Sequence, residues 1–169
     1  MNFTKAITED DVIPDLRVEN LEEAIEEILD LAAENGYVKD KKDKLLRLIV
    51  EREKVKPTLL EAKVLVPHIA SNDFKREVVI YGRSRSGVRL DDTNRIKHFF
   101  FIGVPKRKKA KMFSMISELA IVVSKDKEFL TNLGIARNID DMLLAIQEKK
   151  LPAFTKLRLR FAKLQASFI

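Results

Sequence analysis

Apolar residues recur every three or four positions in several stretches of the chain, and this spacing predicts amphipathic helices. In the first stretch, 21–32, glutamates occupy the opposite side, Asn20 can cap the start and Gly36 can end the helix. Glu23 follows the cap by three residues, which favours a variant of the capping box. Further helices are expected over 40–54, 110–123, 126–133 and, capped by Asp140, 142–147.

Three short apolar runs lack helical spacing and predict strands that are buried on both faces. They cover 64–66, 78–81 and 99–102, and Pro67 and Pro105 are expected to close the first and the third. A short edge strand is expected over 12–16, while the glycine-spaced stretch 82–87 is interpreted as a turn. Helices and short strands alternate, so the sequence predicts an α/β fold, a mixed sheet sandwiched by helices.

The composition narrows the class of protein. The 169 residues favour one domain, expected over 1–148, and no apolar run approaches the length of a membrane span. The chain has no cysteine and two histidines, which argues against thiol chemistry and against a metal site. Its first residues lack an apolar export segment, so a cytoplasmic location is expected.

Charge is distributed unevenly along the chain. The net charge is +6, but residues 1–148 are neutral in total and 149–169 carry six basic and no acidic residues. This extension is basic and amphipathic, since Leu157, Phe161, Leu164 and Phe168 follow helical spacing. It could pack on its own domain, form a homodimer, or bind a partner or a lipid surface. Because the excess charge belongs to the extension, nucleic acid binding is not favoured.

His68 is the strongest candidate for chemistry. It directly follows the predicted buried strand 64–66 and Pro67, and ligand crevices in open α/β sheets lie at such strand ends. A neutral imidazole can act as a nucleophile at cellular pH. Arg52 precedes it by sixteen residues, and its guanidinium could clamp a phosphoryl group. The alternative is a hydrogen-bonded histidine in a loop with an arginine in solvent.

Arg52-Glu53 followed by the run from Val64 to His68 resembles the EIIA domain of the bacterial phosphotransferase system, fructose/mannitol class. Val104-Pro105 and 117–120 are similar to its nitrogen-regulatory branch, and the resemblance covers about residues 6–147. It implies a mixed α/β sandwich in which His68 accepts a phosphoryl group from a phosphorylated histidine carrier protein. The group then passes to a sugar-specific EIIB domain, or its presence signals to a regulatory target. The resemblance places Arg52 beside the site and implies no metal or organic cofactor.

The chain departs from the family pattern at two places. The glycine-rich loop corresponds to 56–63, where only Thr58 remains as a neighbour for the phosphate. The second family histidine falls at Met112, and the adjacent Lys111 is a candidate substitute. These departures leave an alternative function open, a non-catalytic EIIA-like regulator that binds a partner protein through basic surfaces.

A basic cluster precedes the helix expected over 110–123. Its cations oppose the dipole at a helix start, so folding alone does not favour them there. They are candidates for contact with an acidic partner, an anionic membrane surface or phosphate groups, and the alternative is a solvated loop. The cluster consists of Lys106, Arg107, Lys108 and Lys109. His98, at the start of the third apolar run, is interpreted as structural.

Overall fold

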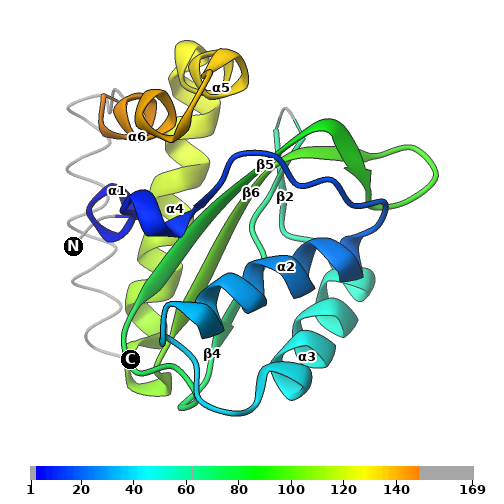
Figure 1. Cartoon of the computed structure of the whole chain (residues 1–169), viewed down its shortest axis with the longest axis vertical. Coiled ribbons are helices and arrows are strands. Elements are labelled where there is room, and N and C mark those ends of the chain that lie inside the picture. The colour runs from blue at the N-terminus through cyan, green and yellow to red at the C-terminus, as the bar shows by residue number, and fades with distance from the viewer. Residues whose placement is uncertain (1–2, 62, 149–169) are drawn as a thin grey trace.

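The computed structural model describes residues 3–61 and 63–148, and it shows one mixed sheet with helices on both faces (Figure 1). Two long antiparallel strands form its centre, and three short strands each lie parallel to the long strand with which they pair. The predicted α/β sandwich is confirmed. The sheet order is β1 (Val12–Ile13), β5 (Val78–Arg89), β6 (Arg95–Val104), β3 (Val64–Leu65) and β2 (Leu59–Leu60), with β4 (His68–Ala70) also paired to β6.

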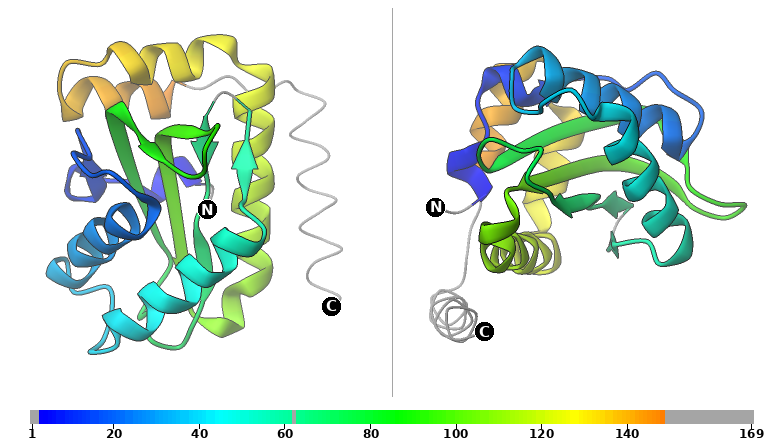
Figure 2. Two further views of the ribbon diagram at one scale, coloured as in Figure 1. Left: turned by 90° about the vertical axis from the view of Figure 1, so that its right-hand side faces the viewer. Right: turned by 90° about the horizontal axis from the view of Figure 1, so that it is seen from below.

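The helices form two layers (Figure 2). Successive strand residues point to opposite faces, so Phe99 and Phe101 pack beneath one layer while Phe100 and Ile102 pack beneath the other. Two hydrophobic cores result, one on each side of the sheet. The first layer contains α2 (Leu21–Glu34) and α3 (Lys42–Val55), and the second contains α1 (Phe3–Ala6), α4 (Lys109–Lys125), α5 (Lys127–Ile135) and α6 (Ile139–Gln147). Short 3-10 turns cover Glu9–Asp11 and Lys106–Lys108.

One of the two helix caps predicted from the sequence is present in the structure, and the other is replaced by a different residue. The side chain of Asn20 accepts a hydrogen bond from Glu23 N at 3.0 Å, as the capping pattern predicts. The prediction that Asp140 caps the last helix is wrong. Asn138 does so, accepting from Asp141 N at 2.9 Å, and α6 begins three residues earlier than expected.

The central hairpin is much longer than its apolar runs. The stretch 82–87, interpreted as a turn, lies within β5, so that prediction is wrong. Opposite it, Arg83 pairs with His98 and Val88 pairs with Ile96, so residues 84–87 of β5 face the single residue Lys97 of β6. These extra residues form a β-bulge, which shifts the alternation of faces and hides the strand pattern in the sequence.

A tight hairpin occupies part of 56–63, where the resemblance placed a glycine-rich loop. Leu59 pairs with Leu65, and Val66 N donates to Thr58 O at 3.0 Å. Near the turn, Lys63 has a φ of 65°, a left-handed conformation that disfavours a residue with a Cβ.

Substituting Lys63→Gly is expected to raise the free energy of unfolding by about 0.5–1 kcal/mol, because glycine removes the left-handed penalty at a smaller entropic cost. Urea denaturation measures the change. Lys63→Ala is the matched control, since it removes the same long side chain but keeps the Cβ. Equal stabilities for the two variants would contradict the explanation.

No helix among residues 3–61 and 63–148 is long and apolar enough to cross a membrane. The proposed extension over 149–169, and the homodimer it could form, lie outside the described residues.

Candidate functional site

His68 is the first residue of β4, a short strand that pairs only with β6. β3 and β4 pair with β6 in a single register, Leu65 opposite Phe99 and His68 opposite Ile102. Pro67 O accepts a hydrogen bond from Ile102 N at 3.0 Å, so the ladder continues across the proline. The prediction that Pro67 closes the first strand is nevertheless confirmed, because β3 ends at Leu65 and a separate strand, β4, begins at His68. Proline removes only a donor, and an edge strand tolerates that loss.

The imidazole of His68 has its two nitrogens in different environments. Nδ1 lies 2.8 Å from Val66 O, and because a carbonyl only accepts, Nδ1 carries the proton and Nε2 holds the lone pair. The residue is 8% exposed. Nε2 has no hydrogen bond among the described residues, yet it is not one of the fully buried unpaired atoms, so it keeps contact with solvent.

The electrostatic environment keeps this ring neutral. Burial lowers the pKa of His68 below its usual range, and the positive charge of Arg52 adds to that effect. The hydrogen bond with Val66 opposes the change only in part. At neutral pH the ring of His68 is therefore uncharged, and its Nε2 has a free lone pair.

Arg52 reaches the same place from the last turns of α3. Its Nη2 donates to the backbone carbonyl of His68 and lies 3.5 Å from Glu53 Oε1. The side chain is 41% exposed, and its Nε and Nη1 make no hydrogen bond within the described part of the chain. The structure thus brings Arg52 and His68 together and leaves guanidinium donors for an anion.

Thr58 is bound by a carboxylate that the sequence analysis did not single out. Thr58 N donates to Glu53 Oε2 at 2.7 Å, and its hydroxyl donates to Oε1 at 3.4 Å. Glu53 is completely buried, and burial raises its pKa against the opposing effect of these bonds and of Arg52. The backbone N–H and the hydroxyl of Thr58 are therefore both engaged in hydrogen bonds with Glu53. The adjacency of Arg52 and Glu53 was the signal that could have identified this carboxylate.

Residues at the start of α4 take positions that the sequence did not predict. Met112 is buried in the core beneath the sheet. Lys111, the candidate substitute for an imidazole, donates to Glu77, which Lys108 also binds at 2.8 Å. Burial alone would raise the pKa of Glu77, but these two lysines lower it to about 2. Lys108 and Lys111 are thus engaged in a partly buried ion-pair cluster.

Phe113, rather than Met112, faces the candidate nucleophile. Its ring centroid lies 6.3 Å from that of His68, with the planes at 71°. The ammonium of Lys109 lies 6.0 Å from the centre of the Phe113 ring. Lys109, expected as part of a partner-binding cluster with Lys106 and Arg107, is therefore also a neighbour of the His68 site.

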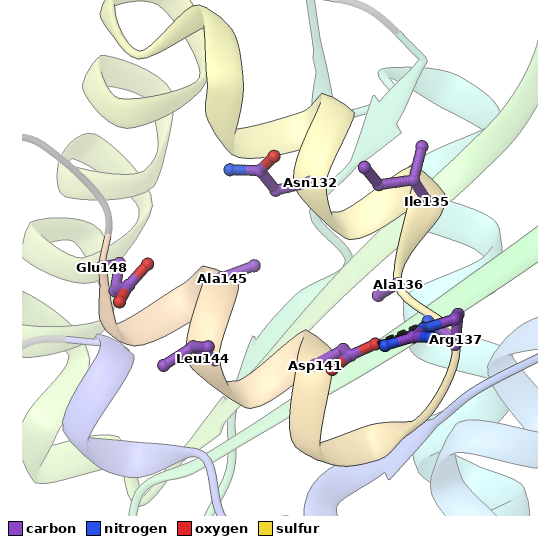
Figure 3. A pocket seen from close by; sticks show the side chains of 8 residues that line it. All are labelled: Asn132, Ile135, Ala136, Arg137, Asp141, Leu144, Ala145 and Glu148. Atoms are coloured by element: carbon purple, nitrogen blue, oxygen red, sulfur yellow. Dashed lines mark hydrogen bonds and ion pairs between the residues drawn. The ribbon is translucent and has the colours of Figure 1, made fainter.

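A separate hollow of about 300 Å³ lies between α5 and α6 (Figure 3). Exposed Ile135 and Leu144 line it, together with an ion pair of 3.4 Å between Arg137 and Asp141. Neither His68 nor Arg52 contributes to its lining. The hollow is thus distinct from the candidate site.

A family model described as "Phosphoenolpyruvate-dependent sugar phosphotransferase system, EIIA 2" matches residues 5–149. The chain belongs to this EIIA family. The resemblance seen in the sequence is therefore confirmed at family level. No curated protein sequence matches the chain.

Solved structures of EIIA proteins share the fold. Nitrogen regulatory protein IIA-Ntr from Neisseria meningitidis superposes with a TM-score of 0.74 at 19% identity, covering 85% of this chain and 97% of that one. IIA mannitol from Escherichia coli superposes with a TM-score of 0.70 at 19% sequence identity. The match covers 83% of this chain and 98% of that one. The complex of Escherichia coli enzyme IIA mannitol with phosphorylated enzyme IIB mannitol has a TM-score of 0.70 at 17% sequence identity. The match covers 85% of this chain and 98% of that one. At such low identity these structures support the EIIA fold.

Proposed function

We propose that this EIIA protein accepts a phosphoryl group on His68 Nε2 from the phosphorylated histidine of a small carrier protein. The observation that carries the proposal is the arrangement of the imidazole, with Nδ1–H held by Val66 O and a lone pair on Nε2, while Arg52 donates to the backbone carbonyl of the same residue. In the reaction Nε2 attacks phosphorus and the new N–P bond forms. The N–P bond of the carrier breaks, and its imidazole recovers the electron pair.

Arg52 is proposed to stabilise the charge that the phosphoryl group brings. Such transfers depend on positioning and on cations around the phosphoryl oxygens, and the free Nε and Nη1 of Arg52 can donate to them. The residues at the site need no metal or organic cofactor for this role.

The phosphoryl group then passes to a second protein, or its presence signals the phosphorylation state. The first course corresponds to sugar transport through an EIIB domain, and a solved EIIA relative of similar fold is bound to a phosphorylated IIB protein. The second corresponds to nitrogen regulation through a target protein, and IIA-Ntr has the same fold.

One observation favours a second candidate function, a regulator that binds its partner without being phosphorylated. The N–H groups of Thr58 and Val66, in the hairpin that replaces the glycine-rich loop, are bonded to Glu53 and to Thr58 O. They are therefore not available to a phosphate. In this case binding would depend on the exposed cations Lys106, Arg107 and Lys109.

Incubation with phosphoenolpyruvate, the first enzyme of the system and the histidine carrier from the same organism tests the proposal. The intact protein is expected to gain the mass of one phosphoryl group, and acid should remove it, because phosphohistidine is acid-labile. His68→Ala should show no gain, whereas the matched variant His98→Gln should retain it.

No gain in the wild-type protein, in a mixture that phosphorylates another EIIA protein, would contradict phosphoryl transfer. The regulator then predicts a partner whose binding survives His68→Ala and is lost when Lys106, Arg107 and Lys109 are neutralised.

A further inference from the structure

The basic residues at the start of α4 fall into two groups according to their partners. Lys108 and Lys111 bind the carboxylate of Glu77, which fastens the start of this helix to the start of β5. Lys109 makes no ion pair among the described residues and is exposed to solvent. Its ammonium is held only at the face of Phe113, by a weak cation–π contact. The charge of Lys109 is therefore available to an anion.

Phe113 connects this free cation to the candidate nucleophile. The ring of His68 and the ammonium of Lys109 each lie close to 6 Å from the Phe113 centroid, so they are at most about 12 Å apart. The side chain of Lys109 is long, flexible and exposed. A phosphoryl group on Nε2 would extend from the nitrogen of His68 that has no hydrogen bond within the described residues.

The position of Lys109 in its helix is unfavourable for folding. It is the first residue of α4, where the helix dipole is positive, and no side chain caps this end. The positive charge of Lys109 is therefore repelled by the positive end of the helix dipole. Glu77 does not pair with Lys109, because its carboxylate binds Lys108 and Lys111. A dianion near His68 would be attracted both by Lys109 and by the start of the helix.

We infer that Lys109 is the second cation of the phosphoryl site, binding the group on His68 where the family pattern has an imidazole and this chain has Met112. The inference rests on the proposed function of His68. It assigns to Lys109 a ligand role that the sequence suggested for Lys111, and it gives Phe113 the role of holding the ammonium close to the site.

Phosphoramidate tests the inference without a carrier protein. Nε2 of His68 attacks phosphorus, the donor N–P bond breaks, and the nitrogen leaves as ammonia. The rate of the acid-labile mass gain is expected to be about tenfold lower in Lys109→Gln, because one charge-assisted contact to the phosphoryl oxygens is lost. Lys109→Arg should largely restore the rate. The matched control Lys125→Gln, an exposed lysine at the other end of the same helix, should react like the wild type.

Titration with inorganic phosphate supplies a second measurement that does not require transfer. The NMR signals of the His68 ring are expected to shift on phosphate binding, and Lys109→Gln should weaken this binding several-fold while Lys125→Gln leaves it unchanged. Lys109-dependent phosphate binding supports the inference even if the carrier protein fails to phosphorylate His68, which would contradict only the proposed function. Equal phosphate binding and equal phosphoramidate rates for Lys109→Gln and Lys125→Gln would overturn the inference, as would the absence of any phosphate effect on His68.

Discussion

Replacing Arg83 with methionine is expected to lower the free energy of unfolding by about 3 kcal/mol, because several buried carbonyl groups lose their donor at once. Arg83 lies on β5, is 3% exposed and forms no ion pair among the described residues. Its Nη1 donates to three carbonyls at the end of α5, those of Leu133 at 2.9 Å, Gly134 at 3.2 Å and Ala136 at 2.7 Å.

The same guanidinium also fixes the first strand. Nε of Arg83 donates to Pro14 O at 3.1 Å, directly after β1. The carbonyl end of a helix is negative, which compensates the buried charge of Arg83 without a carboxylate. Methionine fills much of the same space but donates nothing, so all four carbonyls would be desolvated without a partner.

Urea denaturation of wild type, Arg83→Met and Arg83→Lys provides the test for this bonding. Lysine keeps the charge but cannot match the planar fork, so Arg83→Lys is expected to fall between the other two. A loss below about 1 kcal/mol in Arg83→Met would show that the carbonyls find other partners or water.

Acidification from pH 7 to pH 4 is expected to cost the fold about 3 kcal/mol through His98 alone. Burial, with further contributions from Arg83 and Lys97, lowers the pKa of His98 to about 4 from its usual 6.5. Its Nδ1 forms a hydrogen bond of 2.7 Å with the hydroxyl of Tyr81, and burial raises the pKa of Tyr81, so this hydroxyl stays neutral.

The direction of the pH effect follows from which state binds the proton. Between pH 6.5 and pH 4 the unfolded chain protonates His98 while the folded protein does not. Stability is therefore complete above pH 6.5 and decreases as the pH falls towards 4. The lowered pKa of His68 acts in the same direction, so its contribution must be separated.

Urea denaturation at several pH values, applied to wild type, His98→Gln and His68→Gln, separates the two histidines. The slope of stability against pH between 4 and 6.5 is expected to become much smaller in His98→Gln. His68→Gln should retain most of it. An unchanged slope in His98→Gln would show that His98 is protonated as easily in the folded protein as in the unfolded chain.

The sequence was sufficient where structure depends on neighbouring residues. The helix 21–34 follows from apolar spacing, an asparagine cap and a glycine after its end, all of which act within a few residues. The long hairpin was not predictable in this way. Its polar stretch 82–87 has the composition of a turn, and it is a strand because β6 pairs with it and a bulge accommodates the extra residues.

The same distinction applies to the candidate site, where some residues were identified from the sequence and others were not. His68 and Arg52 were identified because their spacing matches a family pattern, and the structure places them in contact. Lys109 and Phe113 were not identified as neighbours of His68. Their positions depend on how α4 packs beside β4, which no local pattern in the sequence specifies. The expectation for Lys111 used helix geometry alone and could not anticipate Glu77 as its partner.

The lengths of the strands have a consequence for self-association. β6 carries the apolar run 99–102, which would aggregate readily as an exposed strand, but β5 pairs with it on one side and β3 and β4 pair with it on the other. The borders of the sheet are β1 and β2, each of two residues, and β4, of three. Such short borders offer few free backbone groups to a strand from another molecule, so this architecture protects a concentrated solution of the protein from amyloid-like stacking.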